Sequence, residues 1–289
     1  MRKTVACVIA MITAAAASVF AQASAATEPD VTRRMEWAAG RIVMEVTRPL
    51  DVSTPSLVRA KADAETDLEQ RLPEVLSRAL GPLTVDSSHT LSDYFASEPG
   101  LSARLSDIAL HAQRTDLFLT GDLTSLVARY AIPLFGEQGI GSPLYPSKAT
   151  PVRRRLGDVT TRAYTGLLIF ARGMLPSAGT SRLAAARPAL FPRIWDEQMN
   201  LVLDKGMCTT ESLAHWGMVG YSQEVDDPVA DLRVGNVPLR LAARGVFGDK
   251  DTDIIISMDG ARQLLALPEN IALLQTGRIV IVYDSLVTP

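Results

Sequence analysis

Few residues of this chain have the types and spacing that catalysis or metal binding requires. Cys208 and His215 stand seven positions apart and could act as nucleophile and base only if the fold brought them together. Neither His89 nor His111 has a second histidine or cysteine at the spacing of a zinc site. The sequence contains no Gly-x-Ser-x-Gly, Gly-x-Gly-x-x-Gly or phosphate-loop pattern. We therefore assign no catalytic, cofactor-binding or metal-binding residue, and expect a protein that is not an enzyme and needs no cofactor.

One acidic cluster has a spacing like that of metal ligands. Asp249, Asp251 and Asp253 alternate along the chain, as carboxylates do in calcium-binding loops. Such a loop needs glycine at its sixth position and glutamate at its twelfth, where this chain has Ile254 and Gly260. The pattern therefore predicts a polar turn between two strands.

Aromatic and basic residues offer weaker indications of a binding site. Trp37, Trp195 and Trp216 could form a platform for a carbohydrate, but they are scattered in sequence and core packing accounts for them better. The run Arg153-Arg154-Arg155 could bind phosphate or a partner, although a solvated loop is the more common role of such runs.

The first 25 residues have the pattern of a secretory signal peptide. Arg2 and Lys3 precede an apolar stretch over 5–20, and Ala23-Ser24-Ala25 supplies the small residues that signal peptidase accepts. We expect cleavage near Ala25 and a periplasmic chain without a transmembrane segment. Cys7 lies too close to the start for a lipidation signal.

Cleavage changes the charge and the cysteine count. Removing Arg2 and Lys3 from the 29 basic residues leaves 27 against 32 acidic ones, a net charge of −5. This mildly acidic balance argues against nucleic acid as a partner. Cys208 is then the sole cysteine, so it is either a free buried thiol or paired between chains.

The pattern of apolar residues predicts an α+β fold of two small units, each a mixed or antiparallel sheet covered by helices. After a polar leader over 26–34, the first unit spans 35–136. Its expected elements are a strand over 36–47, helices over 56–80 and 101–112, and strands over 117–120 and 125–134. The helix over 56–80 is the clearest element, because its apolar residues recur every three or four positions.

A Gly- and Pro-rich linker over 137–160 precedes the second unit, residues 161–289. We expect strands over 164–172, 190–195, 200–203, 238–247, 253–257 and 278–283, a short helix over 208–216, and a helix from Ser257 or Asp259 to Leu274 that Pro268 divides. The stretches 176–188 and 223–237 are expected to be loops. The last strand is almost continuously β-branched, which favours a central position.

An ordered set of segments in the second unit resembles a known family. The segments are Tyr164-Thr-Gly-Leu-Leu-Ile-Phe-Ala-Arg-Gly, Phe191-Pro-Arg-Ile-Trp-Asp-Glu, Gly217-Met-Val-Gly-Tyr, Arg233-Val-Gly-Asn-Val-Pro-Leu, Ala242–Phe247, Thr252-Asp-Ile-Ile-Ile-Ser, Asp259-Gly-Ala and Arg278–Tyr283. Over 164–283 they resemble exported envelope proteins of the FlgP type, which are related to small surface lipoproteins and to the N-terminal part of FlgT. The chain departs from that family in lacking a lipidation signal and in an Arg/Ala-rich insertion over 180–187.

The resemblance implies a non-catalytic envelope protein that oligomerises, in some members as rings around the flagellar motor. We therefore expect a periplasmic structural or assembly protein, flagellum-associated, that binds copies of itself or envelope partners. The strands over 126–134 and 239–247 would supply sheet edges for this pairing. Two alternatives stay open: a small-ligand or peptidoglycan binder with a polar pocket near Trp216, Tyr221 and Arg240, and a hydrolase using Cys208 and His215.

Overall fold

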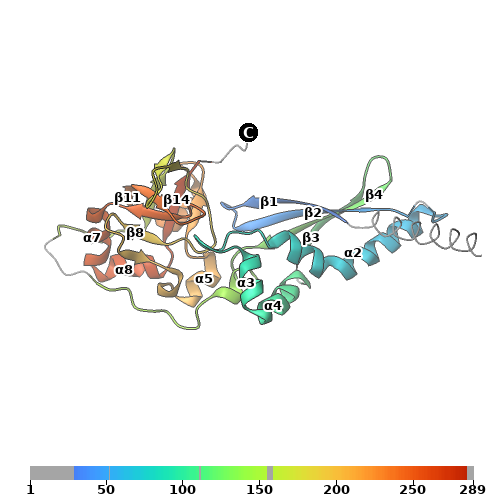
Figure 1. Cartoon of the computed structure of the whole chain (residues 1–289), viewed down its shortest axis with the longest axis horizontal. Coiled ribbons are helices and arrows are strands. Elements are labelled where there is room, and N and C mark those ends of the chain that lie inside the picture. Colours follow the sequence, from blue (N-terminus) through green and yellow to red (C-terminus); the bar gives the residue numbers. More distant parts are fainter. Residues whose placement is uncertain (1–28, 52, 111, 155–158, 285–289) are drawn as a thin grey trace, which may run out of the picture.

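The computed structural model describes residues 29–51, 53–110, 112–154 and 159–284. Two units lie end to end in an elongated molecule (Figure 1). Both combine helices with sheets, so the predicted α+β fold class is confirmed. The expected signal peptide, residues 1–25, lies outside the described residues.

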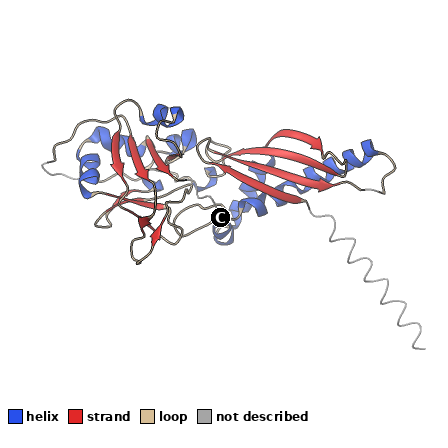
Figure 2. Cartoon of the chain, turned by 90° about the horizontal axis from the view of Figure 1, so that it is seen from above, coloured by secondary structure: helices blue, strands red, loops and turns tan. Residues whose placement is uncertain are grey.

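The first unit is a four-stranded antiparallel sheet with helices on one face. Its strands are β1 (Asp30–Glu36), β2 (Arg41–Pro49), β3 (Gln113–Leu119) and β4 (Ser125–Pro133), in the order β1-β2-β4-β3. Its helices are α2 (Leu57–Leu80), α3 (Leu91–Ser97) and α4 (Pro99–Leu110). Figure 2 shows the long sheet with α2 running beside it.

The helix predicted over 56–80 is confirmed as α2. Its buried residues follow a four-residue spacing: Ala60, Ala64, Leu68, Leu72, Leu76 and Leu80. This stripe packs against the sheet through residues such as Met44 and Tyr130. Leu57, the first residue of the helix, is apolar but 42% exposed.

Several expectations for the first unit were wrong. The polar leader is largely strand β1, whose charged side chains suit an edge strand with one face in solvent; Arg34 and Arg41, for example, both pair with Glu36. The strand over 126–134 offers no edge, because β4 is hydrogen-bonded to β2 and β3 on its two sides. Helix α3 was not predicted.

The second unit contains two four-stranded sheets. One is parallel, in the order β10 (Gly220–Ser222), β14 (Ile279–Tyr283), β5 (Leu167–Ala171) and β11 (Leu239–Ala242). The other is mixed, in the order β12 (Gly245–Phe247), β13 (Asp253–Ile256), β8 (Ile194–Asp196) and β9 (Leu201–Leu203). A small hairpin joins β6 (Leu175–Pro176) and β7 (Leu183–Ala184). The helices are η3 (Lys205–Met207), α5 (Thr210–Trp216), α6 (Pro228–Val234), α7 (Met258–Ala266) and α8 (Pro268–Gln275). A short helix, η2 (Ser142–Leu144), lies in the linker and contacts α4.

The C-terminal elements match their predictions closely. Ser257 caps α7 by accepting a hydrogen bond from the Gly260 amide at 3.2 Å, and Pro268 begins a separate helix. Strand β14 is fully buried between β10 and β5, which confirms its central position. Four predictions for this unit failed. Helix α6 lies in the expected loop over 223–237, and β7 lies in the expected loop over 176–188. The expected strand over 238–247 is two strands in different sheets, and one sheet is parallel where a mixed or antiparallel sheet was expected.

None of the helices in the described part of the chain combines the length and apolar character that crossing a membrane requires.

Candidate functional site at the junction of the two units

Backbone hydrogen bonds join the two units directly. The Leu190 and Phe191 amides donate to the Thr84 and Val85 carbonyls at 3.2 and 2.8 Å. Farther along, the Lys250 amide donates to the Ser87 carbonyl at 3.1 Å. The buried apolar residues of both units also form one continuous cluster, from Ile42 and Leu76 to Ile256 and Ile281. The units therefore meet through a shared core.

A glycine permits the close approach at Ser87. Gly248 has a φ of +90°, and a Cβ atom there would lie 2.3 Å from the Ser87 Cβ. A larger residue would need an unfavourable backbone conformation and would also collide with the first unit. Gly248 thus permits both the left-handed backbone and the close contact with Ser87 at the junction.

Aromatic packing fixes the other side of the junction. Trp37, in the β1–β2 turn, packs edge-on against Tyr221 of β10 with ring centroids 5.3 Å apart. Tyr221 is buried, and its hydroxyl both donates to the Ala189 carbonyl and accepts from the Ala189 amide at 3.0 Å. Burial raises the pKa of Tyr221, so this hydroxyl is a neutral structural group.

A buried arginine holds together the chain segments behind this contact. Arg233 of α6 is 8% exposed, and its guanidinium donates to the carbonyls of Gly277, Trp216 and Gly217 at 2.7 to 2.8 Å. These carbonyls lie at or just beyond the carboxyl ends of α8 and α5, where helices favour positive charge. Its guanidinium also stacks 5.1 Å from the centre of the Trp216 ring. Arg233 thus connects three segments, although its burial lowers its pKa.

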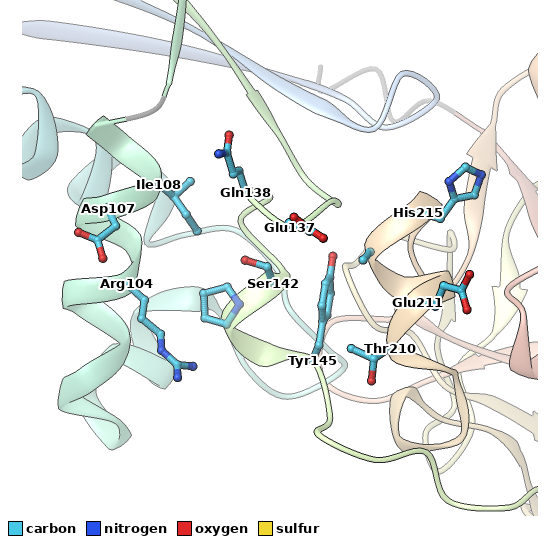
Figure 3. Close-up of a pocket in the computed structure, with 12 residues that line it drawn as sticks. Arg104, Asp107, Ile108, Glu137, Gln138, Ser142, Tyr145, Thr210, Glu211 and His215 are labelled. Atoms are coloured by element: carbon cyan, nitrogen blue, oxygen red, sulfur yellow. The ribbon is translucent and has the colours of Figure 1, made fainter.

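Two hollows flank the junction. The larger, about 910 Å³, lies between α4, the 137–145 segment and α5 (Figure 3). The ionisable side chains on its walls are Arg104, Asp107, Glu137, Glu211 and His215. Figure 3 shows Arg104 and Asp107 on one wall and Glu211 and His215 on the other, with the Tyr145 ring between them. Acid–base catalysis requires groups that converge on one reacting atom. Charges on opposite walls do not meet this requirement.

The smaller hollow, about 440 Å³, lies between the β1–β2 turn, β10 and α6. Its lining is mostly apolar and includes Trp37, Trp216, Tyr221 and Phe135. Pockets that bind small ligands have this character and often lie between domains. It is therefore the better candidate for binding.

The structure does not present Cys208 as a nucleophile. Its side chain is fully buried, and its sulfur contacts the Leu274 and Asp204 carbonyls at 3.7 and 3.9 Å. Burial raises the pKa of the Cys208 thiol to about 12, which disfavours the reactive thiolate. His215 lies on the exposed side of α5, with its ring centroid 5.0 Å from that of Trp216.

The acidic cluster at 249–253 is a polar turn, as predicted. Asp251 accepts two hydrogen bonds from Arg182 at 2.7 and 2.8 Å. Asp253 instead accepts from the Arg193 amide and the Trp195 indole, both at 3.0 Å. Because these carboxylates serve different partners, they do not converge on a cation. Across the described residues, no group of three or more possible metal ligands occurs.

The other residues singled out in the sequence lie in different places. Trp195 packs against Phe247, away from Trp37 and Trp216. Trp216 and Tyr221 line the smaller hollow, but its lining is mostly apolar where a polar pocket was expected, and Arg240 on β11 does not line it. Of the arginine triplet, Arg153 is exposed, Arg154 donates to the Ala266 carbonyl at 2.8 Å, and Arg155 lies outside the described residues.

Sequence reasoning missed Arg233 and the pairing of Trp37 with Tyr221. Arg233 follows an acidic, proline-containing stretch that is typical of a loop, although a single basic residue between Leu232 and Val234 was a detectable signal. No local pattern relates Trp37 to a residue 184 positions later.

The fold and junction define an α+β protein of two units that share a core. Residues 28–138 match the family model described as the N-terminal domain of Treponema pallidum Tp0624, and residues 166–285 match the model of its second domain. The chain is therefore similar, over these stretches and in the same order, to two successive domains of Tp0624. No curated protein matches the chain.

Proposed function

We propose that this protein is a non-catalytic structural or assembly component of the cell envelope, exported to the periplasm and acting by binding copies of itself or partner proteins. The main support is the junction, where two units share one core and hold a fixed elongated shape. Three groups with strongly shifted pKa values in the second unit, Cys208, Tyr221 and Arg233, are enclosed by main-chain partners. They stabilise the interior and are not presented to a substrate.

Association with the flagellar motor is the more specific form of this proposal. It is supported by the ordered resemblance of residues 164–283 to FlgP-type proteins. Two experiments test this association: a tagged chain is located in cells, and motility is measured after the gene is deleted. Envelope location with impaired motility supports the flagellar role, whereas envelope location with normal motility restricts the proposal to a general envelope role.

Sheet edges remain a route to assembly, with one revision. In the first unit β4 is central and offers no edge. In the second unit β11 lies at the end of its sheet, whereas the outer side of β12 is covered, because Val246 is bridged to Ser177 and its carbonyl accepts from the Ala178 amide at 2.9 Å. Unpaired backbone groups at such edges can pair with a strand from another chain.

The second candidate function is binding of a small ligand or peptidoglycan. Trp37, Trp216 and Tyr221 in the smaller hollow favour it, because aromatic rings suit apolar or sugar faces. A pull-down on purified sacculi separates the two candidates: retention that Trp216→Ala abolishes favours the binder.

The third candidate, a hydrolase using Cys208, is not supported by the geometry of the thiol. The Cys208 sulfur is buried, and the pKa of the thiol is raised to about 12. Alkylation of the folded chain tests it, as described in the Discussion.

A further inference from the structure

Helix α6 presents apolar side chains to solvent on the face opposite its buried one. Val229 is 61% exposed and Leu232 is 81% exposed, while Ala230, Arg233 and Val234 face the interior. Residues three apart lie on the same side of a helix, so the two exposed side chains form one apolar ridge. This ridge borders the smaller hollow, which both residues line.

Carboxylates flank this ridge without cationic partners. Glu224, Asp226 and Asp231 are exposed, and within the described residues no ion pair involves them. Many carboxylates elsewhere on the surface are neutralised; Glu36 pairs with Arg41 and Glu45 with Arg129. The basic residues nearby are engaged elsewhere: the Arg233 guanidinium is buried among carbonyls, Arg278 lies over the Trp216 ring at 5.8 Å, and Arg172 pairs with Asp284. The surface is therefore both apolar and negative.

We propose that this surface, the α6 patch (Val229, Leu232, Glu224, Asp226 and Asp231), binds a basic amphipathic segment of a partner protein. The proposal rests on the assembly role given above and names the kind of partner. Apolar side chains of the segment cover Val229 and Leu232 and enter the hollow beside Trp37, while its lysines or arginines meet the three carboxylates. The negative charge disfavours nucleic acids and anionic membranes, which require a basic surface.

A pair of synthetic peptides tests this proposal on the full mature chain. One carries leucines at helical spacing with lysines on the opposite face, and the other has glutamate in place of each lysine. Titration is followed by calorimetry and by the fluorescence of Trp37 and Trp216, which line the hollow. We expect the lysine peptide to bind more tightly, with an affinity that falls as salt rises.

Variants locate the binding surface. Leu232→Ser is expected to weaken lysine-peptide binding about tenfold, and Asp231→Lys about threefold. The matched controls are Leu183→Ser, another exposed leucine, and Glu269→Lys, another exposed carboxylate in the first turn of a helix. Both controls are expected to leave the affinity unchanged.

Three outcomes would overturn the proposal for the α6 patch: no binding of the lysine peptide, equal binding of both peptides, or equal effects of the patch and control variants. Self-association that Leu232→Ser abolishes would make a second copy the occupant and also overturn it. The assembly role is tested separately. It fails if the chain forms no complex in the envelope, whichever surface is used.

Discussion

Trp37 of the first unit and Tyr221 of the second pack edge to face, with ring centroids 5.3 Å apart and ring planes inclined at 66°. They are 184 positions apart in the chain, and their contact closes the junction beside the smaller hollow. Its energetic importance can be measured by removing one ring.

Trp37→Ala is expected to weaken the coupling between the units. Loss of a half-buried indole and its aromatic contact costs about 2 kcal/mol, less than for a fully buried tryptophan. Denaturant unfolding, followed by circular dichroism, should show a lower midpoint and a broader transition than the native chain. Val58→Ala, at an 80% exposed position, is the control and should unfold like the native chain. Identical curves for Trp37→Ala and the native chain would show that this contact does not join the units.

Arg233→Met tests the buried guanidinium. The substitution leaves carbonyls of Trp216, Gly217 and Gly277 without their donor, at a cost of about 3 kcal/mol. Arg233→Lys keeps the charge but not the three-way geometry, so we expect an intermediate loss. Thermal unfolding measures both. If Arg233→Met is as stable as the native chain, the interior does not depend on this residue.

Gly248→Ala tests the close approach to Ser87. Gly179 supplies a matched control, because its φ is +79° but no atom lies within 4 Å of an added Cβ. Both substitutions carry the cost of a left-handed backbone, about 1 kcal/mol. We expect Gly248→Ala to cost at least about 1 kcal/mol more, because of the added collision. Equal midpoints for the two variants would contradict a tight junction at this point.

Alkaline pH should destabilise the fold partly through Cys208. Its pKa is raised from 9.0 to about 12, so the unfolded chain loses this proton first. The stability it contributes is fully present below pH 9 and is lost as pH rises through about 12. Cys208→Ala should therefore lose less stability than the native chain between pH 9 and pH 12. The lowered pKa of Arg233 acts in the opposite direction, but it is common to both chains. Parallel pH profiles would show that the thiol is not shielded.

The same burial predicts slow alkylation. Iodoacetamide at pH 8 should modify Cys208 only after denaturant is added, because the sulfur is fully buried. Rapid modification of the folded chain would restore the hydrolase as a candidate.

The parts of the fold that local patterns determine were predictable. The α2 stripe, the Ser257 cap, the division at Pro268 and the buried strand β14 each follow from spacing or residue type within one segment. Strand β1 was missed because charged residues dominate its exposed edge, and α6 because proline and aspartates at its start are typical of loops. The candidate site was not predictable as a whole. Trp216 and Tyr221 were identified, but Trp37 joins them only through the packing of the two units.

The central claim is that this chain works by association in the envelope. In-cell cross-linking of a tagged chain, followed by fractionation, tests it most directly. We predict that the chain is recovered in the periplasmic or envelope fraction within a cross-linked species larger than the monomer. Recovery as a monomer alone, or in the cytoplasm, would contradict the account.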